Sequence, residues 1–174
     1  MITVDEIMST SLYTLTKEDS VYDARMLMKE KNIRHIPIVA SSGGLVGIVT
    51  ERDLLAASES TLYATSNEER IVLEKAHQLH EIMTSKVCTI DSNDSLKSAA
   101  LHMRKHKHGC LPVICDDELV GIVTDTDFVA VAVHLIEQLE ESSEAMTAQD
   151  FDSSDDYDDY NSFDTEVIDD FETN

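Results

Sequence analysis

The chain has 174 residues, enough for one compact domain or two small units with a shared core, which excludes the catalytic machinery of a large enzyme. Its formal net charge of −22, from 35 acidic and 13 basic residues, excludes nucleic acid and anionic membranes as partners, because both require a cationic face. The first residues show no cationic segment followed by an apolar stretch, and the longest apolar run, 128–133, is too short to cross a bilayer, so we expect a cytoplasmic protein.

The first elements predicted along the chain form a strand–helix–strand–strand–helix unit. They are a strand at 12–15, a helix opened by Ser20, strands at 36–39 and 45–49, and a second helix from Asp53. Ser20 with Asp23 matches a capping box, which places the start of the first helix. A helical segment containing Ile7 and Met8 precedes the unit.

The same unit returns further along the chain. At an offset of 75 residues Pro37 returns as Pro112, and after one deleted residue 45–50 is repeated without change as 119–124. A unit of this size buries too little surface to be stable alone, so we expect the copies to pack together with pseudo-two-fold symmetry and matching clefts. The second copy is predicted as a strand at 87–90, a helix from Ser95, strands at 111–114 and 119–123, and a helix from Asp127 to about Leu139.

The end of the chain differs in charge from the repeats. From Glu140 onward there are 14 acidic and no basic residues, whose mutual repulsion opposes compaction. We therefore expect a first repeat at 1–60, a linker or helical connection at 61–75, a second repeat at 76–142, and a disordered acidic tail at 143–174. Apolar residues within the tail could allow it to fold onto a basic partner.

Several motifs recur in matching order in the two copies. They are the Ile-Met pair before the first strand, the proline strands at 34–39 and 109–114, and the Gly-Ile-Val-Thr sequences that open 47–53 and 121–127. The repeat resembles the cystathionine-β-synthase (CBS) domain, and the pair, over roughly 2–139, resembles the Bateman module. The resemblance implies an α/β (α+β) fold of two βαββα repeats packed through their sheets. It also implies clefts that bind AMP, ADP, ATP or S-adenosylmethionine, with occupancy transmitted to an enzyme or transporter.

Thr50 with Asp53, and Thr124 with Asp127, have the side chains that an adenosine ligand requires. One carboxylate can accept both hydroxyls of a ribose diol, and a threonine at a strand-to-helix junction can face a phosphate together with free helix amides. The same Thr-x-x-Asp spacing also fits a helix-capping box, in which these side chains bond backbone amides and no ligand is involved. Both roles can coexist for threonine.

Other candidate ligand-binding residues surround these pairs. Arg34 and His35 stand where the resemblance implies phosphate contacts, but the second copy has Gly109 and Cys110 there, which puts its phosphate contact in doubt. Arg34 could equally be a solvated edge-strand charge. The remaining candidates are apolar or recur between copies: Ile36, Pro37, Leu111, Pro112, Thr14 and Thr89.

Metal binding and disulfides have little support in the sequence. His102, His106 and His108 are close together, as are His77 and His80, but such spacing is common on solvated helices, and we find no cysteine or carboxylate to complete a set. We therefore predict no metal site. Three cysteines match no disulfide or zinc pattern and are expected to be reduced and buried: Cys88, Cys110 and Cys115.

No catalytic motif is present, so the sequence predicts a regulatory binding module and not an enzyme. We expect it to require no cofactor, to take an adenosine nucleotide as ligand and to form a homodimer. A protein-interaction adaptor with empty clefts, working through the acidic tail, is the alternative, and a small metal-dependent enzyme ranks last.

Overall fold

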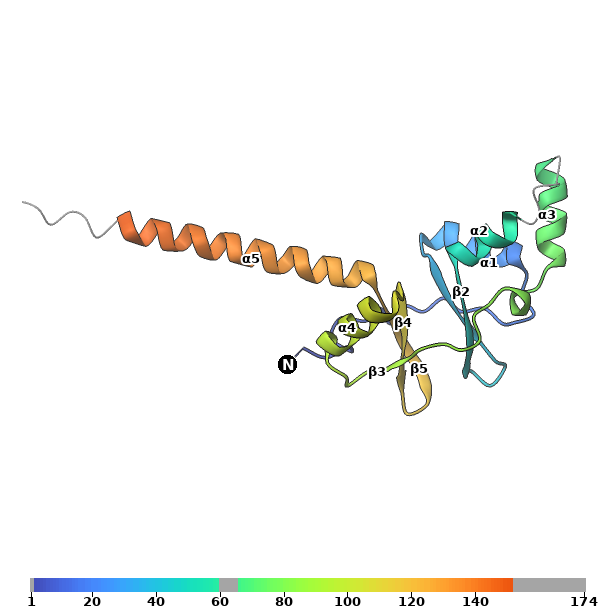
Figure 1. The fold of residues 1–174 in the computed structure, drawn as a ribbon, viewed down its shortest axis with the longest axis horizontal. Helices are drawn as coiled ribbons and strands as arrows, with labels where there is room; N and C mark the ends of the chain where they lie inside the picture. Colours follow the sequence, from blue (N-terminus) through green and yellow to red (C-terminus); the bar gives the residue numbers. More distant parts are fainter. Residues whose placement is uncertain (1, 60–65, 152–174) are drawn as a thin grey trace, which may run out of the picture. The chain divides into compact units, whose positions relative to one another are not determined.

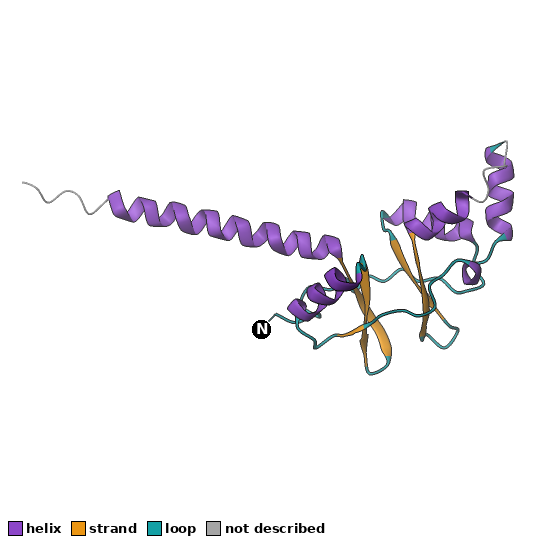
Figure 2. Ribbon diagram, in the orientation of Figure 1, coloured by secondary structure: helices purple, strands orange, loops and turns teal. Residues whose placement is uncertain are grey.

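The structure is a computed structural model that describes residues 2–59 and 66–151, with side chains at 2–57 and 66–142. Its two repeats have a mixed α and β fold and share one order of elements, as predicted (Figure 1, Figure 2). The first contains α1 (Val21–Lys31), β1 (His35–Val39), β2 (Leu45–Thr50) and α2 (Glu51–Glu59). The connection contains α3 (Asn67–Ala76), and a short 3₁₀ helix (Leu79–Glu81) opens the second repeat. The second contains β3 (Ile90–Asp91), α4 (Leu96–His106), β4 (Cys110–Cys115), β5 (Glu118–Thr124) and α5 (Asp125–Phe151).

The first helix of each repeat begins and ends at equivalent residues. The Ser20 hydroxyl accepts the Asp23 N–H at 3.2 Å and the Asp23 carboxylate accepts the Ser20 N–H at 3.1 Å, so the predicted capping box is confirmed. Ser95 caps α4 through the N–H three residues later. Asn32 and Lys107 end the two helices in the left-handed conformation, with φ of 53° and 58°.

Each repeat contains one antiparallel hairpin, β1 with β2 and β4 with β5, and β3 adds a parallel strand beside β4. The strands predicted at 12–15 and 87–90 are wrong in extent. Leu15 makes an isolated bridge with Ile38, and β3 is limited to Ile90–Asp91.

These strands are short because the chain passes from one repeat to the other at this point. Ser9 exchanges two backbone hydrogen bonds with Ile122 of β5, at 2.9 and 3.0 Å, before Leu15 reaches β1. Thr84 exchanges two with Ile48 of β2, also at 2.9 and 3.0 Å, before β3 begins. Few residues remain between the two attachments to pair as a strand.

Each hydrophobic core likewise contains a residue from the leading segment of the other repeat. Val4 is fully buried in the core of the second repeat, against Leu111, Val113 and Val123. Leu79 is fully buried in the core of the first, against Val21, Ile36 and Val49. The leading segment of each repeat therefore completes the core of the other. The repeats at 1–60 and 76–142 are units of sequence, and each of the two cores contains residues from both.

The motif glycines lie where these crossing segments contact the strands. A Cβ atom at Gly47 would lie 2.6 Å from the Met83 sulfur, and one at Gly121 would overlap the Met8 sulfur. Real side chains cannot approach so closely, so the Ile-Met segment of one repeat requires glycine in the Gly-Ile-Val strand of the other.

Gly121→Ala is expected to lower the free energy of unfolding by about 1 to 3 kcal/mol, the usual cost of overfilling a packed site. The new methyl would lie 2.9 Å from Met8 Cγ and 3.2 Å from the Ser9 carbonyl oxygen, which is fixed by its bond to β5. Urea unfolding measures the change. Gly44→Ala is the control, because its Cβ would meet only Ser42 Oγ at 3.9 Å, and equal effects from both variants would contradict the packing argument.

Helix α5 continues to Phe151, so the helix end predicted near Leu139 is wrong. Residues 140–151 contain no glycine or proline and several strong helix formers, so their propensity favours extension of the helix despite the acidic charge. The rest of the predicted tail, 152–174, lies outside the described residues. None of the described helices has a stretch long and apolar enough to cross a membrane.

Candidate functional site

Two cavities of similar size contain the two Thr–Asp pairs. The Asp127 cleft has a volume of about 260 Å³ and joins Thr124 and Asp127 to first-repeat residues that include Tyr13, Arg34, His35 and Pro37. The Asp53 cleft has a volume of about 280 Å³ and joins Thr50 and Asp53 to second-repeat residues that include Cys88, Lys107, Gly109, Cys110 and Pro112. Each cleft therefore takes its Thr–Asp pair from one repeat and its proline strand from the other, as pseudo-two-fold packing requires.

Each Thr–Asp pair caps a helix. Asp53 Oδ2 accepts the N–H of Thr50 at 2.8 Å and its hydroxyl at 2.7 Å, at the start of α2. Asp127 Oδ2 accepts the N–H of Thr124 at 2.6 Å and its hydroxyl at 2.8 Å, at the start of α5. The capping role left open by the sequence is therefore present at both sites. Because these bonds use Oδ2 of each carboxylate, a ribose diol would have to bind Oδ1.

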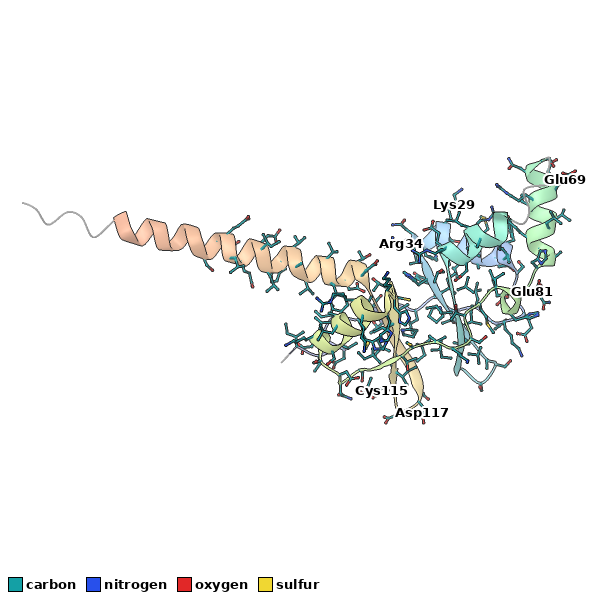
Figure 3. All side chains as sticks on the ribbon, in the orientation of Figure 1. Lys29, Arg34, Glu69, Glu81, Cys115 and Asp117 are labelled. Atoms are coloured by element: carbon teal, nitrogen blue, oxygen red, sulfur yellow. The ribbon has the colours of Figure 1, made fainter. Side chains whose placement is uncertain are left out.

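Arg34 and His35 both lie at the Asp127 cleft. Arg34, at the entry to β1, donates to Asp125 Oδ1 and Thr126 Oγ1, each at 3.3 Å, so a phosphate would compete with the Asp125 carboxylate for the guanidinium (Figure 3). Burial lowers the pKa of His35, although Asp125 acts in the opposite direction, so the imidazole is mainly neutral at pH 7.

The Asp53 cleft carries three cations that sequence reasoning missed: Arg52, Lys86 and Lys107. The residues at the equivalent positions of the Asp127 cleft are uncharged: Thr126, Ser11 and Asn32. The sequence comparison placed no charged phosphate contact here because it considered only Gly109 and Cys110. The positive charge of this cleft comes from other segments of the chain. Comparing the copies residue by residue at the repeat offset would have found it.

A third cavity, of about 540 Å³, is lined by residues from both clefts, including Arg34, Arg52 and Lys107. Cations from the two sites therefore border one shared space. That space suits the phosphates of a ligand whose ribose lies in either cleft.

Four of the candidate residues do not line the clefts. Ile36 and Leu111, the candidates beside the prolines, are fully buried in the two cores. Thr14 and Thr89 are exposed, and the residues just before them, Tyr13 and Cys88, line the clefts instead. The apolar walls come from Pro37 with Ile122 and from Pro112 with Ile48.

The cysteines are free, but Cys88 is exposed and Cys110 and Cys115 are only partly buried, contrary to the expectation that all three are buried. Burial raises the pKa of the Cys110 thiol to about 12. Very little Cys110 is therefore thiolate at pH 8, so Cys110 is expected to be alkylated much more slowly than the exposed Cys88. Mass spectrometry of iodoacetamide-treated native protein measures both rates, and modification of Cys110 at the rate of Cys88 would contradict its burial.

The histidines differ in the side chains that surround them. His77 bonds Glu81 at 2.9 Å and makes no cluster with His80. His102 and His108, in contrast, are joined by Cys88, and their ligand atoms all lie within 4.8 Å of one another. The sequence argument that no cysteine completes a set is wrong, because the fold brings Cys88 beside the two histidines. The argument missed Cys88 because it is distant from them along the chain.

Comparison with known proteins agrees with this fold. The chain matches the model of the CBS domain at residues 4–60 and 79–134. It is 30% identical over 143 residues to a CBS domain-containing protein of Dictyostelium discoideum, covering 82% of this chain and 99% of that one. It is 34% identical over 131 residues to a homoserine O-acetyltransferase of Methanohalophilus mahii, covering 75% of this chain but only 24% of the enzyme.

Solved structures give the same result. A Vibrio cholerae protein assigned to acetoin utilization (AcuB) is 42% identical, with a TM-score of 0.70 over 80% of this chain and 98% of that chain. CBSX2 in complex with AMP is 28% identical, with a TM-score of 0.64 over 78% and 98%. The CBS domain pair of protein MJ0100, in complex with 5′-methylthioadenosine and S-adenosyl-L-methionine, is 28% identical, with a TM-score of 0.64 over 77% and 98%. Two family matches in tandem and neighbours matched over nearly their whole length establish that this chain belongs to the CBS-domain family, as a tandem pair.

Proposed function

We propose that this protein is a regulatory sensor that binds an adenosine ligand in the Asp53 and Asp127 clefts and has no catalytic activity of its own. The observation that carries the proposal is the pair of equivalent clefts, each with a Thr–Asp pair from one repeat facing the proline strand of the other. Cavities of this shape accept a planar base against apolar walls and a ribose against a carboxylate.

The ligand class follows from the polar groups. Oδ1 of Asp53 or Asp127 can accept a ribose hydroxyl as a charge-assisted bond, while Oδ2 keeps the cap. The cations near both sites favour a ligand with phosphates, and similar CBS pairs in complex with AMP, 5′-methylthioadenosine and S-adenosyl-L-methionine support the adenosyl part. AMP, ADP and ATP are therefore the first ligands to test, and S-adenosylmethionine the next.

Regulation follows because each cleft is built from both repeats. A ligand that contacts both stabilises one arrangement of the repeats over others, by as much as its affinity differs between them. We propose that a partner enzyme or transporter responds to that arrangement in the cytoplasm, with the sensor acting as a homodimer. The likeness to about a quarter of an acetyltransferase supports such pairing of a CBS module with an enzyme.

The test is calorimetric titration of Asp53→Ala and Asp127→Ala with adenosine, AMP and ATP. Each variant is expected to weaken binding at its own cleft by about 10- to 150-fold, because a hydrogen bond to a charged group contributes about 1.5 to 3 kcal/mol. If both variants bound all three ligands like the wild type, the sensor function would be contradicted.

A matched control separates ligand binding from capping. Asp19 makes the same two hydrogen bonds in a turn, with Oδ2 accepting the N–H of Thr16 at 2.6 Å and its hydroxyl at 2.9 Å, but it lines neither cleft. Asp19→Ala should lower stability like the other two variants and leave affinity unchanged. An equal loss of affinity in Asp19→Ala would mean that the effect comes through folding.

A further inference from the structure

A cysteine and two histidines form a cluster beside the Asp53 cleft. His102 lies in α4, His108 follows the end of that helix, and Cys88 comes from the segment that leads into β3. The thiol sulfur and one ring nitrogen of each histidine all lie within 4.8 Å of one another. The cluster therefore joins two segments of the second repeat that are separate in sequence.

His102 gives a second, independent indication of a ligand. Its Nε2 atom is buried and has no hydrogen-bond partner. A buried polar atom without a partner costs about 1 to 3 kcal/mol, and such atoms are rare unless a ligand, ion or water satisfies them. A metal ion among these side chains would supply the missing partner.

The distances allow tetrahedral coordination after small side-chain movements. Zinc bonds of about 2.3 Å to sulfur and 2.0 to 2.1 Å to nitrogen place the ligand atoms about 3.3 to 3.7 Å apart in a tetrahedron. The ligand atoms that lie furthest apart must therefore move about 1 Å closer together. Cys88 is exposed, so its side chain can change rotamer toward the histidines.

We propose that Cys88, His102 and His108 bind a zinc ion. Thiolate and imidazole ligands favour zinc over magnesium or calcium, which prefer oxygen. Three protein ligands leave a fourth position for water. Because Cys88 and His108 also line the Asp53 cleft, that position lies at the edge of the cleft. The site does not depend on the proposed adenosine ligand, and it departs from our sequence-based expectation of no metal.

His106 is the nearest side chain that could replace the water. Its ring centroid lies 4.6 Å from that of His102 and 5.8 Å from that of His108. A His106→Ala variant therefore distinguishes a three-ligand from a four-ligand site. We expect it to weaken zinc binding by at most about tenfold, less than the loss of a ligand, because His106 is not one of the three proposed ligands.

The experiment is a titration of the full, tag-free protein with cobalt(II), followed by displacement with zinc. The wild type should bind one equivalent and show the intense near-ultraviolet band of a sulfur–cobalt bond. A hundredfold excess of zinc over its dissociation constant should raise the melting temperature by about 5 to 10 °C. Zinc should also protect Cys88 from alkylation.

Cys88→Ser should abolish the sulfur–cobalt band and weaken zinc binding by at least about 100-fold, and His108→Ala should weaken it similarly. Cys115→Ser is the matched cysteine control, since Cys115 ends β4 and is not one of the clustered residues, and exposed His80→Ala is the histidine control. Both controls should bind like the wild type.

Two results would overturn the proposal. One is a cobalt spectrum without the sulfur band in the wild-type protein. The other is zinc affinity in Cys88→Ser equal to that of Cys115→Ser. Because no nucleotide is present in the titration, neither result bears on the adenosine clefts.

Discussion

Arg25→Ala is expected to lower the free energy of unfolding by about 3 to 5 kcal/mol, the usual effect of removing one partner from a buried ion pair. Glu74 in α3 has a side chain only 2% exposed, and its carboxylate pairs with the Arg25 guanidinium of α1. Arg70 also approaches Glu74, at 3.9 Å, but is more exposed and further away. Without Arg25 the carboxylate would remain buried with one distant counter-charge.

Chemical denaturation of the variant measures this loss of stability. Two further variants test whether the loss comes from the buried ion pair. Lys29→Ala removes an exposed cation from the same helix (Figure 3) and should change stability by less than about 0.5 kcal/mol. Arg25→Met combined with Glu74→Leu should recover most of the loss, because apolar residues of similar size can replace a buried ion pair. An Arg25→Ala effect as small as that of Lys29→Ala would show that the pair contributes nothing to holding α3 on the first repeat.

The fold was predictable wherever the information is local or repeated. Ser20 and Ser95 begin helices because their hydroxyls cap the next turn, and the identical stretches 45–50 and 119–124 fix matching strands. The motif Thr50-x-x-Asp53 was likewise readable as a cap, because the whole interaction lies within four residues.

Features that depend on contacts between the copies were not predictable in this way. Val4 and Leu79 complete cores of the opposite repeats, and nothing in their local sequence indicates which core they enter. The same holds for Lys86, which lies far from Asp53 along the chain yet lines its cleft. Pattern reading compares neighbours in sequence, whereas pseudo-two-fold packing makes neighbours of residues about half the chain apart.

The two clefts should therefore differ most in their response to phosphate. Lys86→Met with Lys107→Asn is expected to weaken ATP binding at the Asp53 cleft by at least about 100-fold, because two charge-assisted bonds of about 1.5 kcal/mol each are removed. Asparagine is chosen at position 107 because that residue has a φ of 58°, and Asn32 adopts φ of 53° at the equivalent position of the first repeat. The substitution thus removes charge without straining the end of α4.

Calorimetric titration with adenosine and ATP separates this charge effect from a general loss of the site. Adenosine has no phosphate, so its affinity for the double variant should stay within about threefold of the wild type, and the difference in ATP affinity should shrink as salt screens the lysines.

Arg34→Ala is the comparison at the Asp127 cleft. It should have a smaller effect on ATP, because the Arg34 guanidinium is already paired with Asp125. Equal losses for ATP and adenosine in the double variant would show that the lysines shape the cleft and do not bind phosphate. A larger loss from Arg34→Ala would place the principal phosphate contact in the Asp127 cleft.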